Sequence, residues 1–469
     1  MEELKAELWG KVSDSALATE LLSAVRAKIG DFGYSANRVL FELFQNADDA
    51  YRQHDSVATD ADFCVELLKG SPGGFRVVHW GRPINHMWHD AEEGRRVGHD
   101  RDLLNMLLMN FSEKRPGDDL TGKFGLGFKS VHVLSDGVGI ASGFIALRTA
   151  GGFLPTPWPD GIDIAERRKT SGGRKATVIE VPFSAETADK GTDAMAAFKS
   201  AVTWLPAFAR IIRRIRIEDD PSAGVDCSSS PLLDESQISV VSVSGGRQER
   251  ALRFDLSSGF ALLLRISAAG PKKFPDDLKR LWNLAPLEVP SRSGWLLNGP
   301  FAVDPGRTGL AGSLADQMET FRKLGRAFGD GLLKLHDLAD ADWCRFAESL
   351  DLDASRTTAW GIFWSHLFDV LVPDFDDELA RYLHTEGHGY GRLIGQHQVV
   401  PTRLPPPFAS LIKASDADHF IDGALSDPAV LGKVRDWPAL TDLLDRTIAS
   451  EIDGQLRKLG FGNIRPLFF

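Results

Sequence analysis

Residues 42–50 read Glu-Leu-Phe-Gln-Asn-Ala-Asp-Asp-Ala, and this segment decides the fold. At about 100° per residue, one helical face carries Glu42, Asn46, Asp49 and Ala50. Apolar side chains such as Phe44 fall on roughly the opposite face, so one side of the helix is expected to be buried. Carboxylates buried without partners cost several kcal/mol. The polar stripe therefore predicts a bound cation or ligand.

A glycine cluster follows at residues 121–131, Thr-Gly-Lys-Phe-Gly-Leu-Gly-Phe-Lys-Ser-Val. Gly122, Gly125 and Gly127 let the backbone approach an anion where a helix begins, and helix-start amides favour phosphate. Glycines also serve turns, so the cluster matters mainly because the acidic helix precedes it. A Walker A loop is disfavoured, because Phe128 is inserted before the lysine and the segment follows a loop and helix instead of a strand.

Together, Glu42-x-x-x-Asn46-x-x-Asp49-Ala50 and Gly122-x-x-Gly125-x-Gly127 resemble the Bergerat ATP-binding fold. That superfamily comprises gyrase, heat-shock chaperones, histidine kinases and mismatch-repair ATPases, and the wording is most similar to its sacsin-type, chaperone-like branch. The resemblance covers about 20–220 well, the next hundred residues loosely and the remainder not at all. We expect an α+β protein in three parts: a two-layer Bergerat-type α/β sandwich at 1–220, which the resemblance implies, a smaller α/β middle domain at 221–320, and a C-terminal region at 321–469 that the sequence pattern predicts to be mainly helical.

The resemblance also implies roles and two cofactors, ATP and Mg²⁺. Glu42 would be the general base that orients water, an effect of about 10² to 10⁴ in rate, and Asn46 would hold the magnesium. A lid would span about 85–121. The implied nucleotide contacts are Asn46, Asp49, Ala50, Trp80, Gly81, Gly122, Phe124, Gly125, Leu126, Gly127, Phe128 and Thr177, with Lys114, Lys123 and Lys129 as looser phosphate candidates.

One departure concerns the adenine contact. The family has Asp-x-Gly after its first internal strand, whereas this chain has His79-Trp80-Gly81, and we place Trp80 at the aspartate position. A hydrogen bond to a charged group contributes about 1.5 to 3 kcal/mol, and stacking of Trp80 on a base could recover about 1 to 3 kcal/mol. The alternatives are that His79 reads the base, that base selectivity is relaxed, or that Trp80 is a core aromatic beside a degenerate pocket.

The segment at 294–310, GWLLNGPFAVDPGRTGL, resembles the Asn-Gly-x-Phe segment that follows the ATPase domain in sacsin-type proteins. In related ATPases a cation after this domain reaches the γ-phosphate, so the resemblance implies a sensor role for Arg307. The alternative is an arginine in a surface turn.

Composition narrows the class of protein. The chain has 469 residues, of which 43% are hydrophobic and 25% charged, as in a soluble globular protein of about three domains. A net charge of −11 disfavours generic nucleic-acid binding. Three widely spaced cysteines, an acidic start and the lack of a long apolar run predict a cytoplasmic protein without a membrane span. The apolar ending Leu-Phe-Phe suggests a cut from a longer parent protein.

Periodicity and turn residues predict the elements of the chain. Helices are expected at 15–29, 35–53, 102–111, 129–134, 320–338 and 360–372, and 204–217 reads as a helix running into a strand. Strands are expected at 75–79, 138–147, 177–181, 238–243, 250–256 and 260–267, with a hairpin turn at Gly245-Gly246. A zinc site at His86-x-x-His89 is a weaker interpretation, since that segment falls in the expected lid.

Two functions remain open. The first is a Mg²⁺-dependent ATPase whose slow hydrolysis drives lid closure, either as a chaperone-like machine or as the ATPase component of a larger assembly such as an antiviral defence system. The second is a non-hydrolysing nucleotide sensor with altered base recognition. Either would work with other subunits or further domains of a longer chain, and the resemblance allows a homodimer. A nucleic-acid remodeller ranks third, and a histidine kinase is disfavoured because no dimerising helical pair precedes residue 35.

Overall fold

The chain divides into two compact units in the computed structural model. The first contains Met1–Ser228, Val243–Gln248 and Val303–Gly309, and the second contains Ser229–Ser242, Glu249–Ala302 and Leu310–Phe469. The structure describes residues 15–52, 61–84, 101–107, 127–170, 173–352, 356–371, 377, 380, 383–384, 388–401 and 411–412. The described chain is mixed α/β, with mostly antiparallel strands and a helical C-terminal part.

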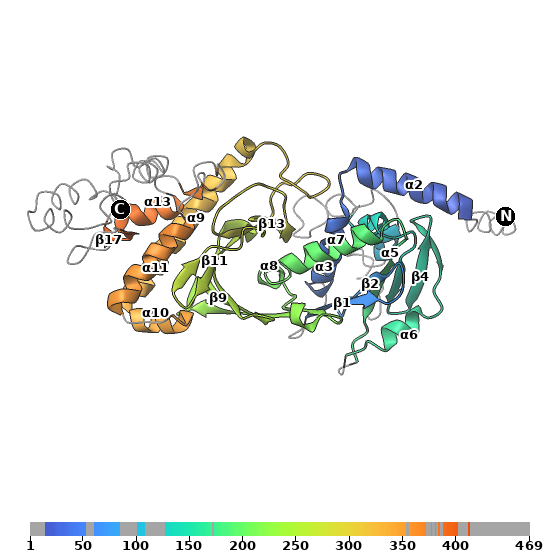
Figure 1. Cartoon of the computed structure of the whole chain (residues 1–469), viewed down its shortest axis with the longest axis horizontal. Helices are drawn as coiled ribbons and strands as arrows, with labels where there is room; N and C mark the ends of the chain where they lie inside the picture. The colour runs from blue at the N-terminus through green and yellow to red at the C-terminus, as the bar shows by residue number, and fades with distance from the viewer. Residues whose placement is uncertain are drawn as a thin grey trace, which may run out of the picture. The chain divides into compact units, whose positions relative to one another are not determined.

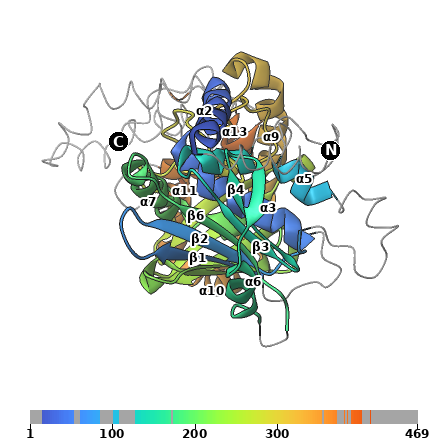
Figure 2. The same cartoon turned by 90° about the vertical axis from the view of Figure 1, so that its right-hand side faces the viewer.

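The first unit is built on a sheet with the strand order β7-β1-β2-β6-β3-β4-β5. Neighbouring strands are antiparallel except β1 and β7, which are parallel, and Figure 2 shows β1, β2, β6 and β3 side by side. The strands are β1 (Asp62–Leu68), β2 (Gly74–His79), β3 (Gly139–Ser142), β4 (Ile145–Ala150), β5 (Leu154–Pro157), β6 (Thr177–Pro182) and β7 (Arg214–Ile217).

Helices cover both faces of this sheet. They are α2 (Ser15–Asp31), η1 (Ala36–Arg38), α3 (Val39–Arg52), α5 (Asp102–Leu107), η3 (Phe128–Val133), α6 (Gly161–Glu166), α7 (Ala188–Ala201), α8 (Leu205–Phe208) and η4 (Pro221–Ala223). Phe44 of α3 meets Phe63 of β1 edge to face at 5.1 Å, and Phe63 also packs against Phe198 of α7. Residues in register with Phe63 therefore face α3 and α7.

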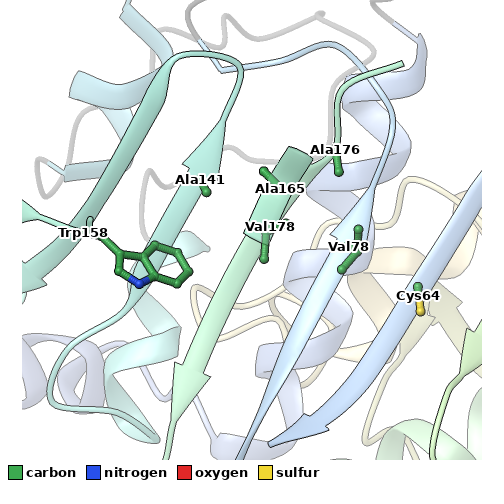
Figure 3. Close-up of a cluster of buried hydrophobic side chains, with 7 residues drawn as sticks. All are labelled: Cys64, Val78, Ala141, Trp158, Ala165, Ala176 and Val178. Atoms are coloured by element: carbon green, nitrogen blue, oxygen red, sulfur yellow. The ribbon is translucent and has the colours of Figure 1, made fainter. Parts of the chain in front are cut away.

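The opposite face of the sheet packs against α6. There Trp158, in the turn before α6, and Ala165, in α6, lie over small and branched side chains of the strands (Figure 3). The buried cluster consists of Cys64, Val78, Ala141, Trp158, Ala165, Ala176 and Val178, with Trp80 packed against it. The sheet thus has a helical layer that includes α3 and α7 on one face, while the six-residue helix α6 packs on the other. Strand alternation decides which face each side chain occupies.

The carboxylate of Asp48 ties α3 to the segment before β7. It accepts hydrogen bonds from the backbone N–H groups of Arg210, Ile211 and Ile212, each at 2.9 Å. Asp48 is 1% exposed, and burial raises its pKa above the ordinary value. Of the two adjacent aspartates, Asp48 therefore has a structural position, while Asp49 belongs to the polar stripe.

The second unit combines a smaller sheet with helices. Its strand order is β9-β10-β11-β15-β13-β14, with β12 on β11; α10 contacts α9 and α11, and α13 packs against α9 (Figure 1). The chain crosses between the units within β8 and β9. The elements from residue 225 onward are β8 (Val225–Leu232), β9 (Glu235–Gly245), β10 (Glu249–Asp255), η5 (Ser257–Gly259), β11 (Ala261–Ser267), β12 (Gly270–Lys272), β13 (Leu281–Asn283), β14 (Ala285–Pro286), β15 (Leu296–Asn298), α9 (Leu314–Ala341), α10 (Trp343–Leu350), α11 (Arg356–Leu371), α13 (Gly389–Gln396), β16 (Val400–Pro401) and β17 (Leu411–Ile412).

Most predicted elements are confirmed to within a few residues, including the hairpin turn after Gly245. The single strand predicted at 138–147 is wrong, because Gly143 takes a positive φ of 61° and turns the chain between β3 and β4. In 204–217 the helix is only four residues long, and 108–111 lies outside the described residues. Strand β1 was not predicted from the sequence.

Two further properties bear on the composition-based predictions. The cysteines are free, with Cys64 and Cys227 buried and Cys344 exposed. Among the residues that the structure describes, no helix has both the length and the apolar character needed to span a bilayer.

We expect Asp48→Ala to destabilise the first unit by about 2 to 4 kcal/mol, because the backbone N–H groups of Arg210, Ile211 and Ile212 lose their carboxyl acceptor. Urea unfolding followed by tryptophan fluorescence measures this change. Lys199→Ala, which removes a solvent-screened pair with Asp220 at 2.8 Å, is the control and should change stability much less. Equal effects of both substitutions would contradict the role assigned to Asp48.

Candidate functional site

Glu42 on α3 is buried, with 3% of its side chain exposed. Nη1 of Arg307 lies 3.2 and 3.3 Å from its two oxygens and donates to Oε1 of Gln45 at 2.7 Å. Nη2 of Arg38, one turn earlier, lies 3.8 Å from Glu42. Two guanidinium groups therefore compensate a carboxylate that has almost no contact with water.

A tight turn at residues 304–309 positions Arg307. The carboxylate of Asp304 accepts from the backbone N–H groups of Thr308 and Gly309, at 2.9 and 2.6 Å. Arg307 itself has a positive φ of 55°. A Cβ on Gly306 would lie 2.6 Å from the carbonyl oxygen of Gly33, so the turn sits directly on the chain after α2. Arg307 is 8% exposed and is not an arginine of a surface turn.

Gly127, the last glycine of the cluster, lies against Glu42. A Cβ on this glycine would come within 2.5 Å of Oε2 of Glu42, which a real side chain does not tolerate. The fold thus brings the end of the glycine cluster to the acidic helix. The other predicted residues of the cluster and lid, Lys114, Gly122, Lys123, Phe124, Gly125 and Leu126, lie outside the described residues, as do His86 and His89.

The polar stripe of α3 has one open position. Within residues 39–49, Asn46 is exposed while every other residue is buried. Asp49 is 7% exposed and Ala50 is half-buried. An exposed amide between buried neighbours can contact a ligand without rearrangement of the helix.

Trp80 does not lie on this side of the sheet, which corrects the alignment made from the sequence. Its ring packs with the Trp158 cluster and its Nε1 donates to the carbonyl oxygen of Arg168 at 2.6 Å. His79 is in register with Phe63, so it faces α3. Counting Asp-x-Gly back from Gly81 also gives His79. Trp80 is therefore a core aromatic, and His79 is the residue of this segment that faces α3.

His79 is adjacent to Thr177, the predicted late threonine. The two are register partners on β2 and β6, and Oγ1 of Thr177 lies 2.6 Å from Oγ of Ser142. His79 is 7% exposed, and burial lowers its pKa to about 4, so the imidazole is neutral at pH 7. Its Nδ1 accepts the N–H of Gly81 at 3.3 Å, which leaves the ring proton on Nε2.

Gly81 permits close contact with α3. A Cβ at this position would lie 2.7 Å from the backbone nitrogen of Tyr51, and the next N–H, of Arg82, donates to the carbonyl oxygen of Ala50 at 2.9 Å. The loop after β2 is therefore held to the C-terminal end of the polar stripe. This accounts for glycine at the third position of the motif.

The residues after the cluster are buried. Phe128 is 8% exposed, and Lys129 is 1% exposed with its ammonium donating to the carbonyl oxygen of Gly152 at 2.7 Å. Burial lowers the pKa of Lys129 to about 8. In this structure Lys129 thus binds the backbone of its own unit.

Sequence reasoning missed three residues of the Glu42 surroundings, namely Tyr34, Arg38 and Gln45. Arg38 and Gln45 stand four residues before and three after Glu42, so helical spacing could have revealed them. The hydroxyl of Tyr34 is buried without a hydrogen-bond partner, and burial, followed by the charge of Glu42, raises its pKa. No local signal pointed to Tyr34.

A scan against models of protein families and a search of curated proteins both find no match to this chain. The geometry described above is therefore the basis for assigning a function.

We expect Arg307→Met to destabilise the first unit by about 3 kcal/mol, because it leaves Glu42 buried with only the more distant Arg38. The double substitution with Glu42→Gln should recover at least about 1 kcal/mol of this loss. Urea unfolding of the four proteins gives the coupling energy. Arg216→Met, at a 56% exposed side chain, is the control and should have an effect below about 1 kcal/mol; a coupling energy of zero would contradict the pairing.

Stability of the first unit should also depend on pH. His79 and His132 both have pKa values lowered to about 4 by burial, while the unfolded value is about 6.5. Between pH 6.5 and 4 the unfolded chain binds more protons, so stability is complete above pH 6.5 and falls as the pH drops. The slope is at most about 1.4 kcal/mol per pH unit for each histidine.

Urea unfolding at pH 7, 6 and 5 measures this slope. The His79→Asn variant should show a shallower decline than the wild type, because one of the two titrating groups is gone. An unchanged slope would mean that His79 is not held neutral by burial.

Proposed function

We propose that this protein is a Mg²⁺-dependent nucleoside triphosphatase of Bergerat type that hydrolyses ATP slowly. The observation that carries the proposal is the contact of Gly127 with Glu42. It joins the end of a glycine cluster suited to phosphate with a buried carboxylate on the acidic helix. The resemblance of these two motifs assigns the same residues to one ATP site, and the two-layer Bergerat sandwich is the finer fold that we propose for the first unit.

The donor set fits a magnesium-bound triphosphate. Asn46 is exposed and offers an amide oxygen, the kind of hard ligand that Mg²⁺ accepts together with phosphate oxygens and water. At Gly127 the lack of a side chain lets the backbone lie directly against the carboxylate of Glu42. Bound Mg²⁺ would neutralise phosphate charge, and Asn46 would hold it.

Arg307 could pair with either of two anions, the carboxylate of Glu42 or a bound triphosphate. In the structure it pairs with Glu42, and a carboxylate that is bound to a cation is a poor acceptor for the proton of water. We propose that Arg307 pairs with phosphate when nucleotide is bound and leaves Glu42 to accept that proton. Arg38 remains one helical turn away and keeps Glu42 in place.

His79 changes how the base is read. The family's aspartate is an acceptor, whereas the neutral imidazole of His79 has its proton on Nε2 and is a donor there. A donor does not pair with the 6-amino group of adenine, but it pairs with a keto oxygen. We therefore propose that selectivity for ATP over GTP is lost, and that GTP binds at least as tightly as ATP.

The second function is a nucleotide sensor that binds without turnover. The observation in its favour is the same ion pair, because Glu42 is inactive as a base for as long as Arg307 holds it. In either case we propose a cytoplasmic protein that acts with other subunits or further domains, as a chaperone-like ATPase or in an antiviral defence assembly. Nucleic acid is not a favoured partner, since Arg214 and Arg216 are paired with Asp62.

Calorimetric titration of MgATP and MgGTP, with phosphate release measured in parallel, tests the proposal. Glu42→Gln should bind nucleotide with near wild-type affinity and hydrolyse it about 10² to 10⁴ times more slowly. Asn46→Ala should weaken binding only when Mg²⁺ is present. His79→Asp should restore a preference for ATP over GTP of about tenfold or more.

Glu180→Gln, on the face of β6 opposite α3, is the matched control and should leave binding and turnover unchanged, since Glu180 pairs with Arg76 and Arg148. Absence of binding by either nucleotide would refute both functions. Binding with turnover that does not depend on Glu42 would refute the role of Glu42, and binding without any turnover would leave the sensor.

A further inference from the structure

Two histidines of the second unit lie face to face. His336 of α9 and His397, which follows α13, have ring centroids 3.7 Å apart with an interplanar angle of 31°. The two histidines are 61 positions apart in the sequence. The packing of α13 against α9 brings them together. Two imidazoles side by side present two nitrogen ligands in one place.

Asp337 adds a carboxylate to this pair. The ligand atoms of His336, His397 and Asp337 all lie within 4.8 Å of one another, and Nδ1 of His336 lies 4.0 Å from Oδ1 of Asp337. The side chain of Asp337 is 74% exposed, so it is free to rotate toward the imidazoles. Asp340, one helical turn after His336, acts on His336 through its charge.

The surroundings leave one ligand atom unsatisfied. Nδ1 of His336 is buried and has no hydrogen-bond partner. The ring of His336 packs between those of Trp360 and Trp364, with centroid distances of 5.5 and 5.2 Å. An unprotonated imidazole nitrogen has a lone pair that can bind a metal ion. A buried polar atom without a partner is costly, and a metal ion would satisfy it.

We propose that His336, His397 and Asp337 form a site for a divalent transition metal, with zinc as the expected ion. Two imidazole nitrogens and one carboxylate are a ligand set that zinc takes, whereas Mg²⁺ and Ca²⁺ prefer oxygen ligands. Asp340 or water completes the coordination. The ion would bridge α9 and the chain after α13, and so fasten the helical part of the second unit. The site is independent of the nucleotide site.

Among the described residues one other group could hold a metal, and it is less suitable. Cys64, Glu66 and Glu218 also lie within 4.8 Å of one another. Glu66 already pairs with Arg76 and Arg168, so its carboxylate is neutralised by two guanidinium groups. The histidine pair is therefore the better candidate.

The test uses the untagged full chain after EDTA treatment, titrated with ZnCl₂ by calorimetry and with CoCl₂ by visible absorption. We expect about one zinc per chain and a rise in the unfolding temperature when zinc is added. His336→Gln and His397→Gln should each lower zinc affinity at least about 100-fold, beyond the 10- to 100-fold typical of losing an outer partner. Asp337→Asn, at an exposed position, should lower affinity without disturbing the fold.

His366→Gln, on α11 of the same unit, is the matched control and should bind zinc like the wild type. The double substitution His86→Gln and His89→Gln tests whether the histidine pair suggested by the sequence binds the zinc instead. It should also leave zinc affinity unchanged. Wild-type affinity in the His397→Gln and Asp337→Asn proteins, with folding checked by circular dichroism, would overturn the proposal. So would a loss of zinc that follows only from substitution of His86 and His89.

Discussion

The first unit depends on how the buried carboxylate of Glu42 is compensated. An ionised group that is 2% exposed needs partners, because the cost of removing it from water is several kcal/mol. Arg38 supplies one cation from the same helix, and Arg307 supplies a second from 265 positions further along the chain. The turn at 303–309 therefore belongs to the first compact unit, although the residues before it at 249–302 and those after it from 310 onward belong to the second. The charge of Glu42 on α3 is thus compensated by a segment that follows residues 249–302 of the second unit in the sequence.

Helix α3 and the strands around it could be predicted because their signals are local. The 3.6-residue spacing of apolar side chains placed Phe44 in the core and Glu42 on the polar stripe, and both positions agree with the structure. The alignment after β2 failed by one residue. Because neighbouring residues of a strand face opposite sides, this error assigned Trp80 to the α3 face, where His79 lies.

The remaining features could not be predicted because they arise from contacts between distant segments. Nothing near Tyr34 in the sequence shows that its hydroxyl is buried close to Glu42 and Arg307. The pairing of His336 with His397 depends on how α13 packs against α9, which no periodicity reports. The resemblance suggested a role for Arg307, but its contact with Glu42 required the turn geometry that begins at Asp304.

Stability alone does not explain why Glu42 and Arg307 are charged. Replacing a buried ion pair by apolar residues of similar volume is often neutral or stabilising, so such a pair is weak evidence for a purely structural role. A pair does differ from an apolar contact in one respect, because either partner can exchange the other for a competing ion. Oε2 of Glu42 lies directly against the backbone of Gly127, and Asn46 is exposed on the same helix. Once Glu42 is buried, Arg307 is needed for stability, and the pair keeps the additional property that either ion can be exchanged for another.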